Sequence, residues 1–145
     1  MLSDVLTREM IVVKGASTTH HDAIREAGEL LVNSGAVTPE YIDAMYERDR
    51  QISTFMGNWL AIPHGTNEAK GAITRPAMCL IRYDNPLDWH GEDVRVVVGI
   101  AGAGDEHLEM LSKVAILFSD LDDVERLLAA KDADEIMAQL LAIED

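Results

Sequence analysis

Two largely apolar stretches, residues 77–82 and 94–100, constrain the fold more than any other feature of the sequence. Neither shows the strict alternation of apolar and polar residues that is expected of a strand with one solvent-exposed face. Both therefore suit strands that are covered on both faces of a sheet. Three further extended segments are predicted, at residues 10–13, 53–56 and 60–62. A sheet of this kind needs helices on each side.

Apolar residues recur at helical spacing in the segments between and after these strands. Five helices are predicted, with starts near His20, Thr38, Asp105, residues 120–122 and Asp132. The first should end at Gly35, while Thr38 and Pro39 supply an N-cap and a favoured first-turn proline for the second. The pattern predicts an α/β fold in which a mixed sheet is sandwiched by helices. A chain of 145 residues suffices for a single domain, residues 1–145.

The charge balance argues against several kinds of partner. The chain has 12 basic and 26 acidic residues, and its formal net charge of −14 would repel nucleic-acid phosphates and anionic lipid. No apolar run approaches the length of a membrane-spanning helix, and the first ten residues lack the features of a secretory signal. The single cysteine, Cys79, lies in an apolar run and is expected to be a buried, inert thiol. We therefore expect a cytoplasmic protein without a membrane segment of its own.

Of the five histidines, His64 has the most constrained setting, because Pro63 precedes it and Gly65 and Thr66 follow. Proline biases Ile62 toward an extended conformation. Glycine removes side-chain bulk, so that another molecule could approach the imidazole and the nearby backbone N–H groups. A histidine placed in this way at a strand end suits the holding of a transferred anion. Taken alone, the motif also fits a turn histidine that is held by structural hydrogen bonds.

His107 follows a glycine-containing stretch, residues 102–104, where a strand should give way to a helix. With Asp105 as the expected N-cap, His107 would lie in the first helical turn. The positive end of the helix dipole and the free N–H groups there favour a bound phosphoryl group and a neutral imidazole. The alternative is a solvent-facing histidine at a helix start. Neither G-x-G-x-x-G nor G-x-x-x-x-G-K-[ST] is present, so the glycines do not predict a nucleotide site.

The remaining candidates give weaker signals. His20 and His21 are adjacent and would point in different directions on a helix, while His90 lies in a turn beside an aromatic residue. We interpret these three as structural or surface residues. The sequence contains no H-E-x-x-H motif, Cys/His ligand spacing or G-x-S-x-G elbow, so no metal centre is predicted. Arg48 falls at the end of a predicted helix, where a cation complements the helix dipole.

Two longer segments carry a family resemblance. Residues 57–70, Gly-Asn-Trp-Leu-Ala-Ile-Pro-His-Gly-Thr-Asn-Glu-Ala-Lys, resemble the phosphorylation-site segment of EIIA domains from the mannitol/fructose family of the bacterial sugar phosphotransferase system. Residues 99–111 resemble the second-histidine segment of that family, at the expected separation. The continuation at residues 67–70 is most similar to the mannitol-specific branch. The resemblance covers nearly the whole chain and implies the EIIA fold of that family.

The resemblance also implies roles for individual residues. His64 matches the histidine that is phosphorylated, His107 matches the second active-site histidine, and Arg48 matches the arginine beside the phosphoryl group. Backbone donors near Gly65 and Thr66 would help these groups to stabilise a loose transition state. The phosphoryl group would arrive from phospho-HPr and leave to a cysteine of EIIB, and no metal, nucleotide or other cofactor would take part.

One departure and two alternatives accompany the resemblance. Asn58 and Trp59 stand where other members often have a different residue pair. The main alternative is a regulatory module similar to the nitrogen-related EIIA proteins, in which phosphorylation controls partner binding. A metal-dependent hydrolase would need ligand spacings that the sequence lacks. We expect a free-standing carrier that meets HPr and EIIB by collision. Mannitol is inferred from the family branch alone, because EIIA does not contact the sugar.

Overall fold

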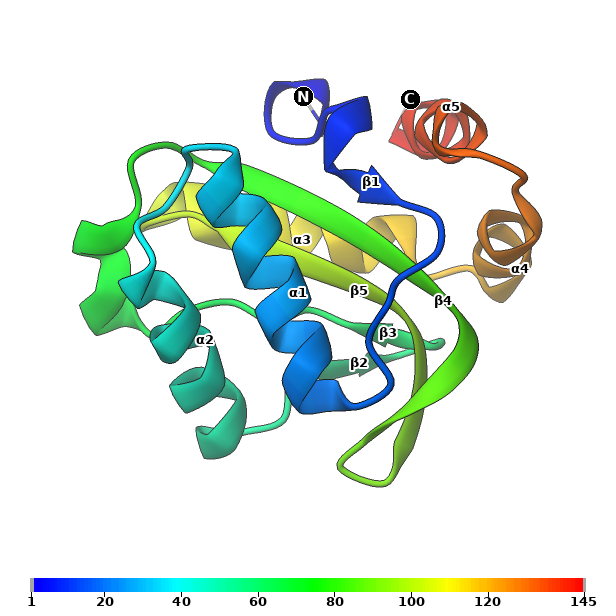
Figure 1. The fold of residues 1–145 in the computed structure, drawn as a ribbon. Helices are drawn as coiled ribbons and strands as arrows, with labels where there is room; N and C mark the ends of the chain where they lie inside the picture. The colour runs from blue at the N-terminus through cyan, green and yellow to red at the C-terminus, as the bar shows by residue number, and fades with distance from the viewer. Residues whose placement is uncertain (1, 145) are drawn as a thin grey trace.

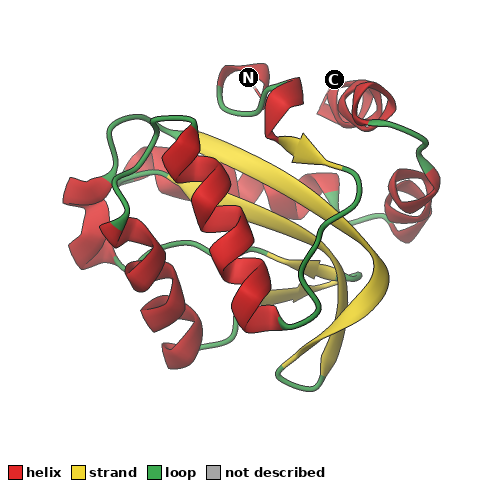
Figure 2. Ribbon diagram, in the orientation of Figure 1, coloured by secondary structure: helices red, strands yellow, loops and turns green. Residues whose placement is uncertain are grey.

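The apolar stretches occupy the centre of a five-stranded mixed sheet in the computed structural model, which describes residues 2–144 (Figures 1 and 2). Its strands are β1 (Ile11–Val12), β2 (Phe55–Gly57), β3 (Leu60–Ala61), β4 (Ala77–Trp89) and β5 (Glu92–Ala101). Their order across the sheet is β1-β4-β5-β3-β2. The central strands β4 and β5 are antiparallel, whereas β1 runs parallel to β4 and β3 runs parallel to β5. The predicted mixed sheet is confirmed.

The central hairpin is longer than the sequence predicted. Residues 83–89 continue β4 although they contain Asn85 and Pro86, which normally favour turns. The pairing with β5 is irregular in this stretch, and the burial pattern changes from continuous to mixed. The chain reverses at His90 and Gly91, whose φ angles of 53° and 94° are those of a tight hairpin turn. His90 is therefore a turn residue, as predicted.

The five predicted helices are all present in the described residues. They are α1 (His20–Asn33), α2 (Glu40–Gln51), α3 (Asp105–Leu117), α4 (Leu121–Ala129) and α5 (Ala133–Glu144). Three short 3₁₀ segments accompany them, η1 (Leu2–Asp4), η2 (Arg8–Met10) and η3 (Asn67–Ala72). Figure 1 shows α1 and α2 in front of the sheet and α3 behind it. The sheet is therefore covered on both faces, which explains its uninterrupted apolar strands.

Two helix starts differ from the prediction by one residue, that of α2 lying later and that of α3 lying earlier. The N-cap residue of α2 is Pro39 and not Thr38, and Pro39 already has helical angles, φ −56° and ψ −27°. The N-cap residue of α3 is Gly104 and not Asp105. Its angles, φ 61° and ψ −129°, lie in a region that glycine occupies far more readily than aspartate. The backbone geometry thus overrides the side-chain capping preference, and His107 still falls in the first turn.

The turn between β2 and β3 contains Asn58 and Trp59, the pair that the sequence analysis expected to differ from other family members. Gly57, Asn58 and Trp59 all have positive φ angles, of 92°, 49° and 70°. The Asn58 side-chain amide donates to the carbonyl oxygen of Phe118 at 2.9 Å, and the Trp59 carbonyl accepts the N–H of Arg95 at 2.9 Å. The pair therefore ties this edge of the sheet to the end of α3 and to β5.

Two further predictions concern burial and membranes. Cys79 is fully buried in β4, and burial raises the pKa of its thiol to about 12, so the thiol stays protonated. This confirms the expected buried thiol. Within residues 2–144, no helix combines the length and the hydrophobicity that crossing a membrane would require.

Two neighbouring parallel strands position the candidate residues. β3 ends at Ala61, and the chain continues to His64, which forms an isolated parallel bridge with Ile100 of β5. β5 ends at Ala101 and leads through glycines into α3, which carries His107. The carboxyl ends of adjacent parallel strands lie at the same edge of a sheet, and this edge is a common place for ligand sites in α/β folds. The topology therefore brings the two histidines together.

Candidate functional site

His64 is held by its own backbone turn. The side chain is buried, with 5% of its surface exposed, and Nδ1 lies 2.7 Å from the carbonyl oxygen of Ile62. A carbonyl oxygen can only accept a hydrogen bond, so Nδ1 carries the proton in this contact. In the neutral ring, Nε2 then has a free lone pair. The turn thus selects one tautomer and leaves Nε2 as the nucleophilic nitrogen.

The surroundings of His64 also keep its imidazole neutral. The pKa of His64 is lowered to about 4, mainly by burial; the nearby His107 and Arg48 act in the same direction, whereas the hydrogen bond to Ile62 opposes the shift. At pH 7 the ring is therefore unprotonated at Nε2. A neutral imidazole can act as a nucleophile, whereas a protonated one cannot.

Tyr41 fixes the loop that follows His64. Its hydroxyl accepts the Gly65 N–H at 2.9 Å and donates to the Ile100 carbonyl oxygen at 2.8 Å. A Cβ atom on Gly65 would lie 2.5 Å from Tyr41 Cε1, so the close packing requires glycine. Burial raises the pKa of Tyr41 to about 12, which keeps the phenol neutral and able to donate. In the sequence, Tyr41 has the spacing of an apolar helix residue, and no local motif indicates this role.

This contact corrects one expectation about the backbone donors. The Gly65 N–H is already bonded to the Tyr41 hydroxyl, so it is not the free donor that the sequence suggested. Thr66 comes next in the chain, at the start of η3, and lines the same hollow as His64.

His107 lies beside His64 in the first turn of α3. The two ring centroids are 4.9 Å apart and the ring planes are inclined by 53°. Burial and the nearby Arg48 lower the pKa of His107, which favours a neutral ring with one N–H donor. A Cβ atom on Gly102 would lie 2.1 Å from Met110 Cε and 3.2 Å from the His107 backbone nitrogen. Glycine at this position therefore lets α3 start close to the end of β5.

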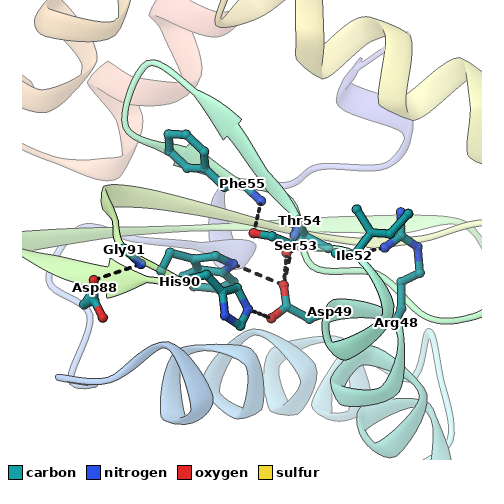
Figure 3. Close-up of polar contacts among 10 residues, drawn as sticks. Arg48, Asp49, Ile52, Ser53, Thr54, Phe55, Asp88, His90 and Gly91 are labelled. Atoms are coloured by element: carbon teal, nitrogen blue, oxygen red, sulfur yellow. Dashed lines mark hydrogen bonds and ion pairs between the residues drawn. The ribbon is translucent and has the colours of Figure 1, made fainter.

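Arg48 lines the same hollow from the end of α2. The hollow has a volume of about 380 Å³ and is also lined by His64, His107, Gly65 and Thr66; we call it the His64 cleft. The guanidinium Nη1 donates to the Ile52 carbonyl oxygen at 2.8 Å, which anchors the side chain (Figure 3). The structure thus brings together the five residues that the sequence analysis named for the phosphoryl site: His64, His107, Arg48, Gly65 and Thr66. A permanent cation and two neutral imidazoles suit the reversible holding of an anion.

A second polar cluster, unrecognised in the sequence, lies beside Arg48. Asp49 is 3% exposed and accepts hydrogen bonds from the Thr54 N–H at 3.0 Å and the Thr54 hydroxyl at 2.6 Å. It also accepts from Trp89 Nε1 at 3.1 Å, and its Oδ2 lies 2.6 Å from His90 Nε2 (Figure 3). Burial alone would raise the pKa of Asp49, but these hydrogen bonds lower it below its ordinary value. The carboxylate thereby fixes the end of α2 against the central hairpin.

The sequence matches, over residues 4–143, the family described as the phosphoenolpyruvate-dependent sugar phosphotransferase system, EIIA 2. The match spans nearly the whole chain, and the protein belongs to this family of phosphotransferase components.

Individual relatives agree with this assignment. The mannitol-specific phosphotransferase enzyme IIA component of Halalkalibacterium halodurans is 49% identical over 140 residues, which are 97% of each chain. The crystal structure of IIA mannitol from Escherichia coli matches with a TM-score of 0.86 and 33% identity, over 92% of this chain and 97% of that one. The solution structure of the complex of E. coli IIA mannitol with phosphorylated IIB mannitol matches with a TM-score of 0.88 and 31% identity. That match covers 95% of this chain and 99% of the other, and the predicted fold is confirmed.

Proposed function

We propose that this protein is a cytoplasmic phosphocarrier that receives a phosphoryl group from phospho-HPr on Nε2 of His64 and passes it to a cysteine of EIIB. One observation carries the proposal: His64 is buried and neutral, with Nδ1 bonded to the Ile62 carbonyl, in a cleft shared with His107 and Arg48. This arrangement fixes which nitrogen reacts and places positive charge where the phosphoryl group would sit.

In the first transfer, the Nε2 lone pair of His64 attacks the phosphorus atom as the bond to HPr breaks. The Nδ1 proton stays on the ring and remains hydrogen-bonded to Ile62, so no proton has to leave before attack. In the second transfer, an EIIB thiolate attacks the same phosphorus and the bond to Nε2 breaks, which regenerates the neutral imidazole. Both steps transfer a phosphoryl group between two protein nucleophiles, and positioning and charge stabilisation supply the catalysis.

Arg48 and His107 would stabilise the group during both transfers. The Arg48 guanidinium supplies a permanent charge and several N–H donors that match phosphoryl oxygens. The neutral His107 supplies one N–H donor, and the Thr66 backbone N–H supplies another. These donors would be preorganised, so they could stabilise the charge of the transition state without moving during the reaction.

We propose mannitol as the sugar, because the H. halodurans relative that bears this name is 49% identical over nearly its full length. The E. coli complex of IIA mannitol with phosphorylated IIB mannitol supports EIIB as the acceptor. We further propose that residues 1–145 form one domain of this kind.

The test is phosphotransfer with purified components. Labelled phosphoenolpyruvate, Enzyme I and HPr should label the wild-type protein but not the His64→Ala variant, and a mannitol-type EIIB should then remove the label. Normal labelling of the variant would refute the assignment of His64. A wild-type protein that is labelled but delivers nothing to EIIB, and instead binds another protein according to its phosphorylation state, would favour the regulatory alternative.

A further inference from the structure

His20, Asp49 and His90 meet at one point although they come from three different elements. His20 is the first residue of α1, Asp49 lies in the last turn of α2, and His90 lies in the turn between β4 and β5. One potential ligand atom from each residue lies within 4.8 Å of the other two. The point is distinct from the His64 cleft, whose lining includes none of the three residues.

The two oxygens of the Asp49 carboxylate have different surroundings. Oδ1 accepts three hydrogen bonds, from the Thr54 N–H, the Thr54 hydroxyl and Trp89 Nε1. Oδ2 instead faces His90, at 2.6 Å from Nε2. Hydrogen bonds to the non-ligating atom of a carboxylate or imidazole are the usual means by which proteins orient metal ligands. The Thr54 and Trp89 donors thus hold Oδ1 and leave Oδ2, on a carboxylate that is more than nine-tenths buried, facing His90.

The two imidazoles are suited to accept a metal ion. Their ring centroids are 4.6 Å apart, and the His20 ring also packs edge-on against Trp89 at 5.5 Å. The His90 side chain is 40% exposed, so an ion can reach the point from solvent.

Metal binding requires only a small adjustment. Ligand atoms about 2.1 Å from a tetrahedral zinc ion lie roughly 3.4 Å from one another. The contact between His90 and Asp49 would therefore widen by less than ~1 Å, and the ligand atom of His20 already lies within 4.8 Å of both. His90 can move in this way because it lies in an exposed turn.

We propose that His20, Asp49 and His90 bind a divalent transition-metal ion of the zinc type, with water in the fourth position. Two imidazoles and one carboxylate are ligands that zinc accepts, whereas magnesium and calcium prefer oxygen ligands only. The ion would join the start of α1, the end of α2 and the central hairpin. This role is structural and independent of the phosphocarrier function, and its failure would leave that function untouched.

The experiment uses the full chain without a histidine tag, after removal of metal by a chelator. Calorimetric titration with zinc chloride should show one equivalent bound, and bound cobalt(II) should give the visible absorption of a tetrahedral site. Zinc should also raise the melting temperature. His20→Gln and His90→Gln should each weaken zinc binding at least tenfold. His21→Gln is the matched control, because His21 stacks on Tyr46 and is not part of the cluster, and it should bind zinc as the wild type does.

The outcome is decisive in either direction. A variant His107→Gln tests whether zinc instead binds at the His64 cleft, and it should bind zinc normally. Loss of binding in His107→Gln with retention in His90→Gln would overturn the proposal, as would unchanged binding in both His20→Gln and His90→Gln. Circular dichroism establishes that each variant is folded, and HPr-dependent labelling does so independently for the His20 and His90 variants. Loss of zinc binding in a folded His20 or His90 variant therefore supports the site.

Discussion

The Tyr41 hydroxyl accepts the Gly65 N–H at 2.9 Å, and it donates to the carbonyl oxygen of Ile100 at 2.8 Å. One buried phenol on α2 therefore connects the residue after His64 to the end of β5. His64 and Ile100 also form a backbone bridge. Tyr41 therefore fixes the position of the His64 loop against β5, the strand that leads to His107.

Tyr41→Phe should destabilise the protein and slow phosphorylation. The change leaves the part-buried Gly65 N–H and the buried Ile100 carbonyl oxygen without their shared partner, which costs about 1–3 kcal/mol. Chemical denaturation gives the loss of stability, and the initial rate of labelling from phospho-HPr gives the effect on function. Tyr46→Phe is the matched control, since the buried Tyr46 hydroxyl has no hydrogen-bond partner among residues 2–144. Equal losses in the two variants would show that the Tyr41 hydroxyl has no special role.

Gly65→Ala should disturb the same loop by steric pressure. The new methyl group would lie 2.5 Å from Tyr41 Cε1, and overpacking of this kind costs about 1–3 kcal/mol. We expect labelling at His64 to fall as the loop moves away from His107. Gly71→Ala is the control, because a Cβ atom there meets nothing within 4 Å. Labelling and urea unfolding of the two variants compare the positions, and a fully active Gly65→Ala protein would contradict this account.

The stability of the protein should fall as the pH is lowered between about 6.5 and 4, in part because of His64. Its pKa is lowered to about 4 in the folded protein, against an ordinary value of 6.5. Between these values the unfolded chain binds the proton and the folded one does not, so acid favours unfolding. The full effect is about 3 kcal/mol. The measurement is the free energy of unfolding against pH for the wild type and for His64→Gln. The variant should show a shallower loss over this interval, and parallel curves would exclude the predicted shift.

Much of the His64 cleft could be predicted because its parts lie in two continuous segments. Residues 57–70 hold the strand end and the Pro63-His64-Gly65 turn, while residues 99–111 hold the next strand end and the helix start. Each segment has a local pattern, and adjacent parallel strands bring their ends together. The side-by-side position of His64 and His107 follows from that topology.

Contacts between distant residues could not be predicted in this way. Tyr41 looks like an apolar helix residue in the sequence, yet its hydroxyl partners lie 24 and 59 residues away. Asp49 and His90 are 41 residues apart and fit no ligand-spacing motif. Only the packing of α2 against the central hairpin joins them. The start of α3 was misplaced by one residue for a different reason: Gly104 adopts a φ angle of 61° that suits glycine, and side-chain capping preferences do not predict it.

Arg48→Ala should slow phosphoryl transfer roughly 100-fold, the usual effect of removing one preorganised donor from a transition-state site. The folded structure should persist, because the only hydrogen bond described for this side chain within residues 2–144 goes to the Ile52 carbonyl oxygen. Quenched-flow labelling measures the rates of transfer to and from His64. Arg50→Ala removes an exposed cation two residues away on the same helix and should react like the wild type. If both variants are equally slow, the effect belongs to net charge and not to Arg48.

The rim of the His64 cleft should contribute to encounters with HPr and EIIB. Leu108 is 62% exposed, follows His107 directly and lines the cleft, and an apolar side chain in this place fits a small, transient contact surface. Leu108→Asp should therefore raise KM for phospho-HPr about fivefold to tenfold and change kcat little, because the charge lies at the docking surface and not at the reacting atoms.

Ile116→Asp provides the control for this prediction. Ile116 lies on the same helix with a similar exposure of 66%, but it does not line the cleft. The substitution adds the same charge to the same element, so it accounts for any effect of net charge on association with the partners. Steady-state transfer from phospho-HPr, measured over a range of salt concentrations, should give a near-normal KM for Ile116→Asp. A KM that rises equally in both variants would mean that the partners sense the overall charge of α3, and that Leu108 makes no specific contact.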